Sequence, residues 1–412
     1  MDLIVRNSRI RGSESKKDIG IDGGKIVKIA GKIEGRGERE IDAKGRLVAP
    51  PLVNAHVHLD KCLTGDWVRS TLGASSCADV IGMAAEIKRK FTVEDIEKRA
   101  GKGVELAVLH GGPVIRAFAD VDTIGGLTAV KALTKVRDRY RNIADIQVVA
   151  FPQEGIVRDE GSEELMWKAM ELGADVVGGI PWYEYLDDDV RRHVDIAFQI
   201  AKHFDRDIGM LVDDTDDPNS RSLEYLAVKT IREKYFGRVA ASHCGALTAY
   251  DDYHAKRVID LVKKAGITIV SNPHISLMIN GRLDKQPMRR GITRVRELLE
   301  AGENVASGQD DVDDPYYPFG RADMLEVGYM MCHAAQMSLP NEIEKVFDMI
   351  TVNGAKALRI KDYGIEVGKR ANLIVFDAYS VPEAFRMQSS RLFVIKDGHI
   401  VAENTVNRKL HI

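Results

Sequence analysis

The chain has 412 residues, of which 44% are hydrophobic and 29% charged, and its 59 basic and 62 acidic side chains leave a net charge of −3. These values are typical of a globular protein with one large domain and a smaller one. The near-balanced charge creates no field that would favour nucleic acid or an anionic membrane, and we expect neither as a partner. The N-terminus, MDLIVRNSRI, lacks the long apolar segment of a signal peptide. The four cysteines are scattered without a CxxC pair, which favours the cytoplasm.

Both ends of the chain are predicted to form short strands. Residues 19–29 hold Asp22, Gly23 and Gly24 between apolar arms, a strong hairpin signal because glycine accepts the positive φ that such turns need. Near the C-terminus, residues 371–376 read as a strand and residues 392–401 as a hairpin. We therefore expect one discontinuous β-sandwich domain, built from residues 1–49 and 366–412, with a structural role.

The middle of the chain, residues 50–365, alternates apolar strand-like runs with amphipathic helical segments. Eight such βα units favour a closed parallel (β/α)8 barrel of the TIM type over an open sheet. The predicted strands are residues 52–57, 113–118, 146–151, 174–180, 208–212, 239–242, 267–270 and 304–307. The predicted helices include residues 93–109, 163–172, 189–203, 221–236, 255–265 and 295–301.

The first predicted barrel strand ends in VNAHVHLD, residues 53–60, which contains His56 and His58. Alternate residues of a strand face the same side, so both imidazoles point toward one spot. The spacing alone is equally compatible with two histidines that line a polar strand. Carboxylates further along the chain favour half of a metal site instead.

Other polar residues follow the remaining predicted strands. In a barrel of this kind the chemistry lies at the C-terminal ends of the strands, so we expect these side chains on one rim. Two imidazoles and a carboxylate can hold one divalent ion, zinc or iron, which makes a water molecule acidic enough to attack at neutral pH. This set predicts a hydrolase that attacks a carbon bonded to nitrogen. The rim residues are Gln153 after strand 3, Asp213 and Asp214 after strand 5, His243 after strand 6, and Asp310 and Asp311 after strand 8.

The other histidines are weaker candidates. His193, His203 and His254 lie in polar helical stretches, and we expect them to be solvated. His333 is expected to pack within a helix and His274 to serve a loop.

Residues 53–60 resemble the strand-1 signature of the amidohydrolase superfamily. Later segments are similar to its cytosine deaminase branch, which also holds N-isopropylammelide isopropylaminohydrolase. The similarity runs nearly end to end. The segments that match are FPQEG (151–155), RRGITR (289–294), GQDDVDDPYYP (308–318) and KDYGI (361–365).

The resemblance implies a role for each matching residue. It assigns metal binding to His56, His58 and Asp310, with Asp310 also accepting a proton. His243 would contact the attacking water or the substrate. A small nitrogen heterocycle is the implied substrate, and we also expect a homo-oligomer. The implied substrate-binding residues are Gln153 at the ring edge, Asp311 beside the ring and Tyr316 as an aromatic wall.

Strand 5 departs from the family pattern His-Cys-Asp-Glu. Leu211 stands where the family has a metal-binding histidine, and Asp214 replaces the glutamate that moves protons. Three outcomes fit: His243 or a strand-5 aspartate completes the metal site, the metal binds weakly and the substrate differs, or the metal is lost.

Strand 2 also departs from the family, because Ala-Phe-Ala-Asp at residues 117–120 replaces Thr-His-Val-Asp. The retained ligands nevertheless favour an active aminohydrolase with a changed site, deamination by metal-activated water being the leading reaction. Hydrolysis of a cyclic amide or an N-alkylamine is one alternative. A metal-free ligand-binding pseudoenzyme is another.

Overall fold

The structure is a computed structural model that describes residues 1–67, 77–407 and 409–411. Its central feature is a sheet of eight parallel strands, which follow one another around the sheet in chain order. The predicted (β/α)8 barrel is confirmed, with every predicted barrel strand present. The strands are β6 (Val53–Val57), β7 (Val114–Asp120), β8 (Asp145–Phe151), β9 (Val176–Val177), β10 (Asp207–Val212), β11 (Val239–His243), β12 (Thr268–Ser271) and β13 (Val305–Ser307).

The barrel closes between its first and last strands. A parallel bridge joins Val57 to Asp310, just beyond β13. The backbone amide of Asp310 donates to the carbonyl of His56 at 2.9 Å, and the amide of His58 donates to the carbonyl of Asp310 at 2.8 Å. The closure therefore fixes these three residues in one short ladder.

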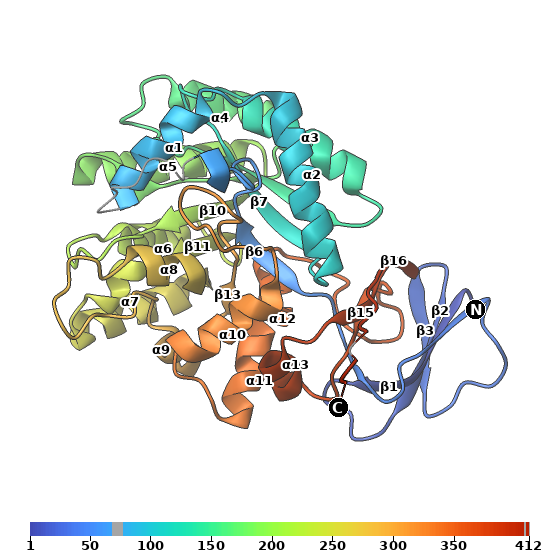
Figure 1. The fold of residues 1–412 in the computed structure, drawn as a ribbon. Coiled ribbons are helices and arrows are strands. Elements are labelled where there is room, and N and C mark those ends of the chain that lie inside the picture. The colour runs from blue at the N-terminus through green and yellow to red at the C-terminus, as the bar shows by residue number, and fades with distance from the viewer. Residues whose placement is uncertain (68–76, 408, 412) are drawn as a thin grey trace.

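Helices cover the outside of the barrel (Figure 1). α3 follows β7 and was absent from the predicted set. The helices are α1 (Cys77–Lys88), α2 (Val93–Leu109), α3 (Thr128–Tyr140), α4 (Ser162–Glu171), α5 (Asp187–His203), α6 (Ser222–Arg232), α7 (Asp252–Ala265), α8 (Pro273–Ile279), α9 (Val295–Glu300), α10 (Met324–Ala334), α11 (Pro340–Met349), α12 (Val352–Ala357) and α13 (Val381–Met387). Three short 3-10 helices are η1 (Gly65–Trp67), η2 (Pro181–Tyr183) and η3 (Gly245–Thr248).

The α2 helix illustrates why these segments are helical. The Thr92 side chain caps its first turn by accepting from the Asp95 amide. Ile96, Ala100 and Val104 recur every four residues and are buried. This stripe lies in the main hydrophobic core, between the barrel and its helices.

The two ends of the chain build a second, mixed sheet beside the barrel (Figure 1). β5 joins the two ends, because it pairs with β1 in parallel and with β14 in antiparallel. The expected small β domain from both termini is confirmed, as one continuous sheet with its own apolar core. Its boundaries stay a prediction. The strands are β1 (Leu3–Ile10), β2 (Lys17–Asp22), β3 (Lys25–Ala30), β4 (Arg39–Asp42), β5 (Leu47–Ala49), β14 (Leu373–Phe376), β15 (Arg391–Lys396) and β16 (His399–Glu403).

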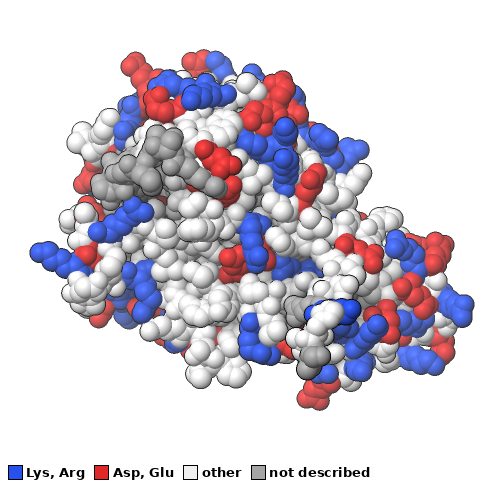
Figure 2. Space-filling view, in the orientation of Figure 1, with Lys and Arg blue, Asp and Glu red and all other residues white. Residues whose placement is uncertain are grey.

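The described residues show a surface of mixed charge and unpaired cysteines. Figure 2 shows basic and acidic side chains mixed over the visible face. None of the helices in the described ranges is long and apolar enough to cross a membrane. Cys62, Cys244 and Cys332 are free thiols.

Three histidine predictions were wrong. His193 is buried rather than solvated, because its ring forms a hydrogen bond with the buried carboxylate of Glu184. His274 is buried within α8, not in a loop. His333 is exposed on α10 rather than packed, and its Nδ1 donates to the Tyr329 carbonyl at 2.8 Å.

Candidate active site

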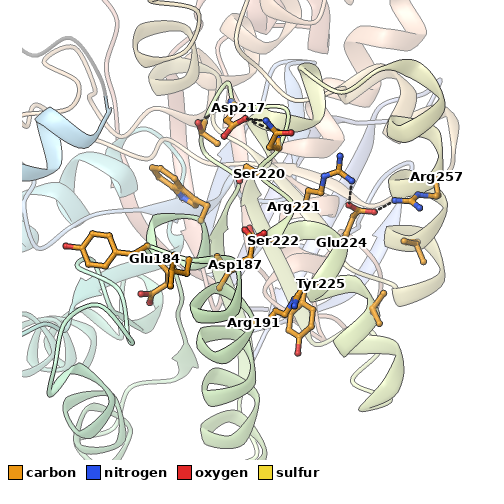
Figure 3. Close-up of a pocket in the computed structure, with 18 of the residues that line it drawn as sticks. Glu184, Asp187, Arg191, Asp217, Ser220, Arg221, Ser222, Glu224, Tyr225 and Arg257 are labelled. Atoms are coloured by element: carbon orange, nitrogen blue, oxygen red, sulfur yellow. Dashed lines mark hydrogen bonds and ion pairs between the residues drawn. The ribbon is translucent and has the colours of Figure 1, made fainter.

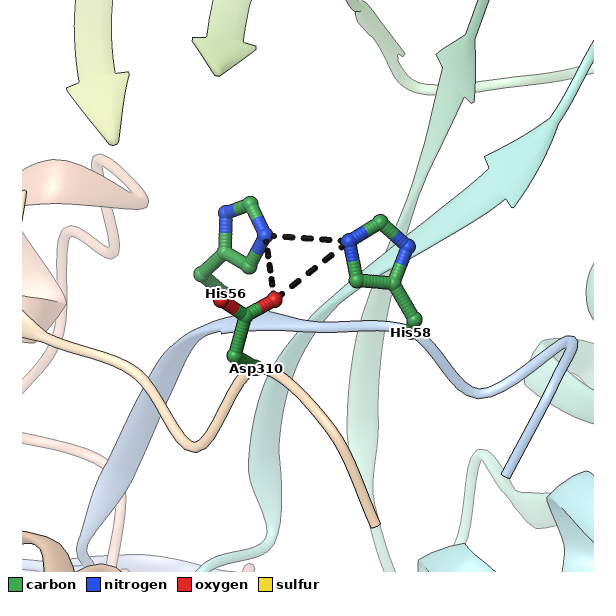
Figure 4. Close-up of side chains that lie close together, drawn as sticks. All are labelled: His56, His58 and Asp310. Carbon is green, nitrogen blue, oxygen red and sulfur yellow. Dashed lines mark hydrogen bonds and ion pairs between the residues drawn. The ribbon is translucent and has the colours of Figure 1, made fainter. Parts of the chain in front are cut away.

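Three predicted ligands meet where the barrel closes (Figure 4). The Nε2 atoms of His56 and His58 lie 3.3 Å apart. The Oδ1 atom of Asp310 lies 3.2 Å from His56 Nε2 and 3.4 Å from His58 Nε2. All three side chains are buried, and their ligand atoms form a nearly equilateral triangle.

This triangle fits a divalent ion. In a tetrahedral site with bonds of about 2.0–2.1 Å, neighbouring ligand atoms lie about 3.3 Å apart. The three observed edges of 3.2–3.4 Å match that spacing. The donor set of two imidazoles and one carboxylate leaves the fourth tetrahedral position free, as catalytic zinc sites require.

The surroundings of His56 prepare it to bind a metal through Nε2. Its Nδ1 lies 2.8 Å from Ser242 Oγ, which can accept the ring proton and leave the Nε2 lone pair free. The ring lies against Phe118, with centroids 3.9 Å apart. Burial lowers the pKa of His56, so the imidazole is neutral at physiological pH.

Two site residues at the barrel mouth have a left-handed backbone: His243, the last residue of β11, with a φ of 70°, and Asp310, after β13, with a φ of 66°. The predicted rim residue Asp213 has a φ of 47°, but its carboxylate accepts from the backbone amides of Ser222 and Leu223 at the start of α6 and does not border the cavity. Such left-handed conformations cost about 1–3 kcal/mol each for residues other than glycine. They are typical of functional sites, where the fold holds side chains in unfavourable directions.

His243 connects the ligand triangle to strand 5. Its Nε2 lies 3.5 Å from Asp310 Oδ2, and its Nδ1 lies 3.3 Å from Asp214 Oδ1. Burial opposes charge on this ring, yet Asp214 and Asp310 together raise the pKa of His243 to about 9. Asn272 bridges the same pair, because its Nδ2 lies 3.3 Å from both His243 Nε2 and Asp310 Oδ2. His243 thus lies beside the triangle rather than in it.

One cavity collects the predicted site residues. It offers about 30 Å³ of space beside the ligand triangle. Polar predicted residues border it together with a set of apolar side chains. The polar set is His58, Gln153, Asp214, His243, Asp310, Asp311 and Tyr316, and the apolar set is Ile81, Ile180, Trp182, Leu211, Ile275 and Ile279.

Leu211 is part of an apolar cluster at this cavity. The cluster contains Phe118, Phe151, Ile180 and Leu211, with Trp182 packed against it. Phe118 and Leu211 are the two positions at which the resemblance to the family predicts histidines. Their contact through one cluster shows that the strand-2 and strand-5 departures fill the same space with apolar groups.

Asp311 borders the cavity, and its carboxyl group interacts with the buried carboxyl group of Asp314. Burial first, and then the charges of Asp314 and Asp310, raise the pKa of Asp311 well above its usual range. Burial likewise raises the pKa of Asp314 to about 7. Both carboxyl groups therefore keep a proton to higher pH than exposed ones, and in the protonated form each can donate as well as accept hydrogen bonds.

Two buried lysines near the site were missed by sequence reasoning. Lys61 Nζ donates to Asp120 Oδ1 at 2.8 Å and to Gln153 Oε1 at 3.4 Å, and lies 3.1 Å from His58 Nδ1. Lys88 Nζ contacts the carboxylates of Asp120, Asp122 and Glu154. The only signal in the sequence was the position of Lys61, three residues after His58.

Lys61 also accounts for a second cluster of possible metal ligands. His58, Asp60 and Asp120 lie close enough to share an ion. The Lys61 ammonium lies among them, 3.8 Å from Asp60 Oδ1. Burial opposes its charge, but Asp120 and Asp60 outweigh burial and raise the pKa of Lys61. The lysine thus supplies the positive charge that a second metal ion would bring.

A larger hollow lies outside the barrel mouth, between the η2–α5 segment and α6 (Figure 3). It is lined by charged side chains, including the Glu224–Arg257 ion pair at 2.5 Å. None of the predicted site residues lines it, and Trp182 borders both this hollow and the site cavity. The ligand triangle thus belongs to the inner cavity.

Comparison with known proteins gives consistent matches along the whole chain. The sequence model described as "Amidohydrolase family" matches residues 39–406. N-isopropylammelide isopropyl amidohydrolase of Pseudomonas sp. strain ADP is 34% identical over 413 residues, covering 98% of each chain. Pterin deaminase of Rhizobium rhizogenes is 27% identical and covers 87% of this chain and 82% of its own. The crystal structure of 5-methylcytosine deaminase from Klebsiella pneumoniae, liganded with phosphonocytosine, superposes with a TM-score of 0.94 at 35% identity. That match covers 99% of this chain and 100% of the other.

Proposed function

The chain belongs to the amidohydrolase family, and on that premise we propose that it is a metal-dependent aminohydrolase of a small nitrogen heterocycle. The reaction would replace an exocyclic amino group by oxygen, releasing ammonia. One divalent ion, zinc or iron, would be held by His56, His58 and Asp310. The cytoplasmic location and the homo-oligomer stay predictions from the sequence.

The main support for this proposal is the ligand triangle, which lies at the base of the site cavity. Its edges of 3.2–3.4 Å suit a tetrahedral ion, and the cavity above it has both polar and apolar walls. A bound ion would make a water molecule acidic enough to attack at neutral pH. That chemistry suits a ring carbon bonded to a leaving nitrogen.

The two oxygens of Asp310 are suited to different tasks. Oδ1 faces the two imidazoles, while Oδ2 faces His243 and Asn272. Asp310 can therefore take a proton from the attacking water and pass it toward the leaving nitrogen. His243 would steady the oxygen that adds to the ring, and Asp214 would hold His243 in place.

The remaining polar residues would orient the ring. Gln153 presents an amide that can pair with a ring N–H or carbonyl. Asp311, whose pKa is raised by burial and by the charges of Asp314 and Asp310, can pair with a second ring edge. Tyr316 offers an aromatic face. These contacts would bring the carbon next to the attacking water, which lowers the entropic part of the barrier.

A second candidate function is hydrolysis of an N-alkylamino group. The apolar wall of Ile180, Trp182 and Leu211 supports it, because an alkyl substituent on the leaving nitrogen could pack there. The Pseudomonas relative is named for removal of an isopropyl-bearing group. The released product, ammonia or an alkylamine, separates the two candidates.

The test begins with the metal content of purified protein, measured as isolated and after addition of Zn²⁺ or Fe²⁺. A panel of aminopyrimidines, alkylamino-triazines and cyclic amides is then scored for ammonia, alkylamine and ring opening. We expect one ion per chain and release of ammonia from an aminopyrimidine. His56→Ala should lose both metal and turnover, whereas His203→Ala, at an exposed histidine, should retain both.

Each contrary outcome has a definite meaning. Turnover without bound metal would contradict the proposed mechanism. Tight binding of a heterocycle without metal or turnover would identify a ligand-binding pseudoenzyme. Ring opening as the main product would move the reaction to cyclic amides.

A further inference from the structure

A buried glutamate outside the site cavity holds the loop that carries Gln153. Glu184 follows η2, and its side chain is 0% exposed. Its Oε1 accepts from the backbone amides of Ile156 at 2.7 Å and Val157 at 3.0 Å. Its Oε2 accepts from the amide of Arg158 at 2.8 Å. Three consecutive N–H groups just beyond Gln153 therefore converge on one carboxylate.

His193 extends this contact to the next loop. The ring lies on α5, is 0% exposed, and donates from Nδ1 to Glu184 Oε1 at 2.6 Å. Its Nε2 accepts from the backbone amide of Ile180 at 3.0 Å. These two bonds fix a single neutral tautomer, with the proton on Nδ1. Glu184 and His193 thus join the loop after β8 to the loop after β9; we call them the loop bracket.

Glycines on both loops leave room for the loop bracket. At Gly155, φ is +92°, and a Cβ would lie 2.9 Å from Glu184 Oε1. At Gly179, a Cβ would lie 2.9 Å from His193 Nε2. Either methyl group would push the loop away from its partner. Both loops are therefore shaped to approach the bracket closely.

The joined loops form one wall of the site cavity, whereas the bracket itself does not border that cavity. Gln153 comes from the first loop, and Ile180 and Trp182 come from the second. Glu184 instead borders the outer hollow (Figure 3). Any effect of the bracket on a bound ring must pass through these wall residues.

We propose that Glu184 and His193 are positioning residues that set where Gln153 meets the substrate, by locking the loops after β8 and β9 to each other. This inference rests on the proposed function only for its kinetic consequence. The lock itself is a property of the backbone and can be tested without turnover.

The first experiment measures amide hydrogen exchange of the metal-loaded full chain and of its Glu184→Ala variant. The amides of Ile156, Val157 and Arg158 should exchange about tenfold faster in the variant, since each loses its hydrogen bond to the carboxylate. Exchange in the terminal sheet should not change. Equal protection at residues 156–158 in both proteins would show that Glu184 does not hold the loop after β8 in place.

The second experiment is a double-mutant cycle on kcat/KM. Glu184→Ala should lower kcat/KM about tenfold while leaving metal content unchanged. In a Gln153→Ala background the same change should lower kcat/KM less than about threefold, because residues that act through one another are not additive. Additive losses would show that Glu184 does not act through Gln153 and would overturn the positioning role.

Two further variants keep the test interpretable. Glu184→Gln preserves the size and one acceptor oxygen but turns a donor toward Arg158, so it should fall between wild type and Glu184→Ala. Asp18 is the matched control, because it also accepts from two backbone amides, those of Asn7 and Ile33, but lies in the terminal sheet. Asp18→Ala should reduce stability with kcat/KM unchanged. If no heterocycle is turned over by the wild-type chain, the proposed function fails while the exchange result still decides the lock.

Discussion

Leu211 cannot bind metal, and it occupies a position at which the resemblance to the family predicts a metal-binding histidine. The side chain borders the cavity and is only 6% exposed, packed in the cluster that includes Phe118 and Phe151. In the proposed metal site, Leu211 would lower the affinity because it offers no ligand atom, and it also makes the cavity wall apolar. A substitution at this position separates these two effects.

Leu211→His should raise metal affinity. The new imidazole would start from a backbone position that already faces the cavity. Changes in residues around metal ligands alter affinity roughly 10–100-fold, and an added ligand should exceed that. Part of the gain will be lost because the ring must enter an apolar cluster. Chelator competition on both proteins measures the difference.

Leu211→Asn is the control for polarity without a ring nitrogen, and it should not tighten binding. If Leu211→His holds its metal no more tightly than Leu211→Asn, the strand-5 position does not face the ion.

Gln153→Ala should weaken catalysis without disturbing the metal. An orienting hydrogen bond left unmade costs about 1–3 kcal/mol, so kcat/KM should fall tenfold or more. Metal content and the unfolding midpoint should stay close to wild type, since the amide is not one of the ligands. Steady-state kinetics on the best panel substrate gives the answer. Unchanged kinetics would assign the ring edge to another wall.

The positions of single residues could be predicted best where they follow from the geometry of a strand. His56 and His58 could be placed together from alternation alone, and Asp310 could be placed from its position after the last strand. The roles of Lys61, Ser242 and Asn272 could not be predicted, because they depend on side-chain contacts across the barrel. His193 stood among charged neighbours and looked solvated, yet its buried partner Glu184 lies nine residues earlier.

At the scale of elements, α1 is fastened to the barrel by one buried cation. Lys88 is the last residue of α1 and reaches Asp122 at 2.5 Å, Asp120 at 3.1 Å and Glu154 at 3.2 Å. Burial opposes its charge, but the three carboxylates raise the pKa of Lys88. Glu154 follows Gln153, so this contact also touches the loop that the bracket holds.

Lys88→Met should destabilise the protein by about 3–5 kcal/mol, because it leaves buried carboxylates without their cation. Urea unfolding followed by circular dichroism measures the change. Lys90→Met, two residues later and exposed, should shift stability by less than about 0.5 kcal/mol. A similar effect of both substitutions would show that the Lys88 network contributes little.

Element prediction was sound for strands and incomplete for helices. All eight barrel strands were found, because apolar runs between turn signals are a strong pattern. β9 is shorter than expected, since it spans only Val176–Val177. α3 begins after Leu127 without a side-chain cap, so its start carries no local signal.

At the scale of the whole molecule, the terminal sheet is tied to the barrel by charged residues. Asp145, at the start of β8, pairs with Lys396 at 3.1 Å and Arg370 at 3.1 Å. Arg391 on β15 pairs with Asp323 before α10 at 2.6 Å, with both side chains buried. These contacts join segments far apart in sequence, and no pattern in the sequence could have paired them.

The stability of the whole fold should also depend on pH through Glu303, between α9 and β13. Burial, only partly offset by Lys263, raises the pKa of Glu303 to about 7, and the residue is 8% exposed. Because the folded state then binds its proton more tightly than the unfolded state, stability is lost as the pH rises from about 4.5 to about 7. Glu303→Gln removes this titration. It should stabilise the fold by about 1–2 kcal/mol at pH 8 and have little effect at pH 4.

Urea unfolding from pH 4 to pH 9 measures this dependence. Glu300→Gln, an exposed neighbour on α9, is the matched control and should show no such gain. The decisive comparison is the slope between the two pH values: the wild-type curve should fall relative to that of Glu303→Gln and then run parallel above pH 8. A constant offset at all pH values would mean that Glu303 acts through packing, because only a proton bound more tightly in the folded state gives an offset that grows with pH.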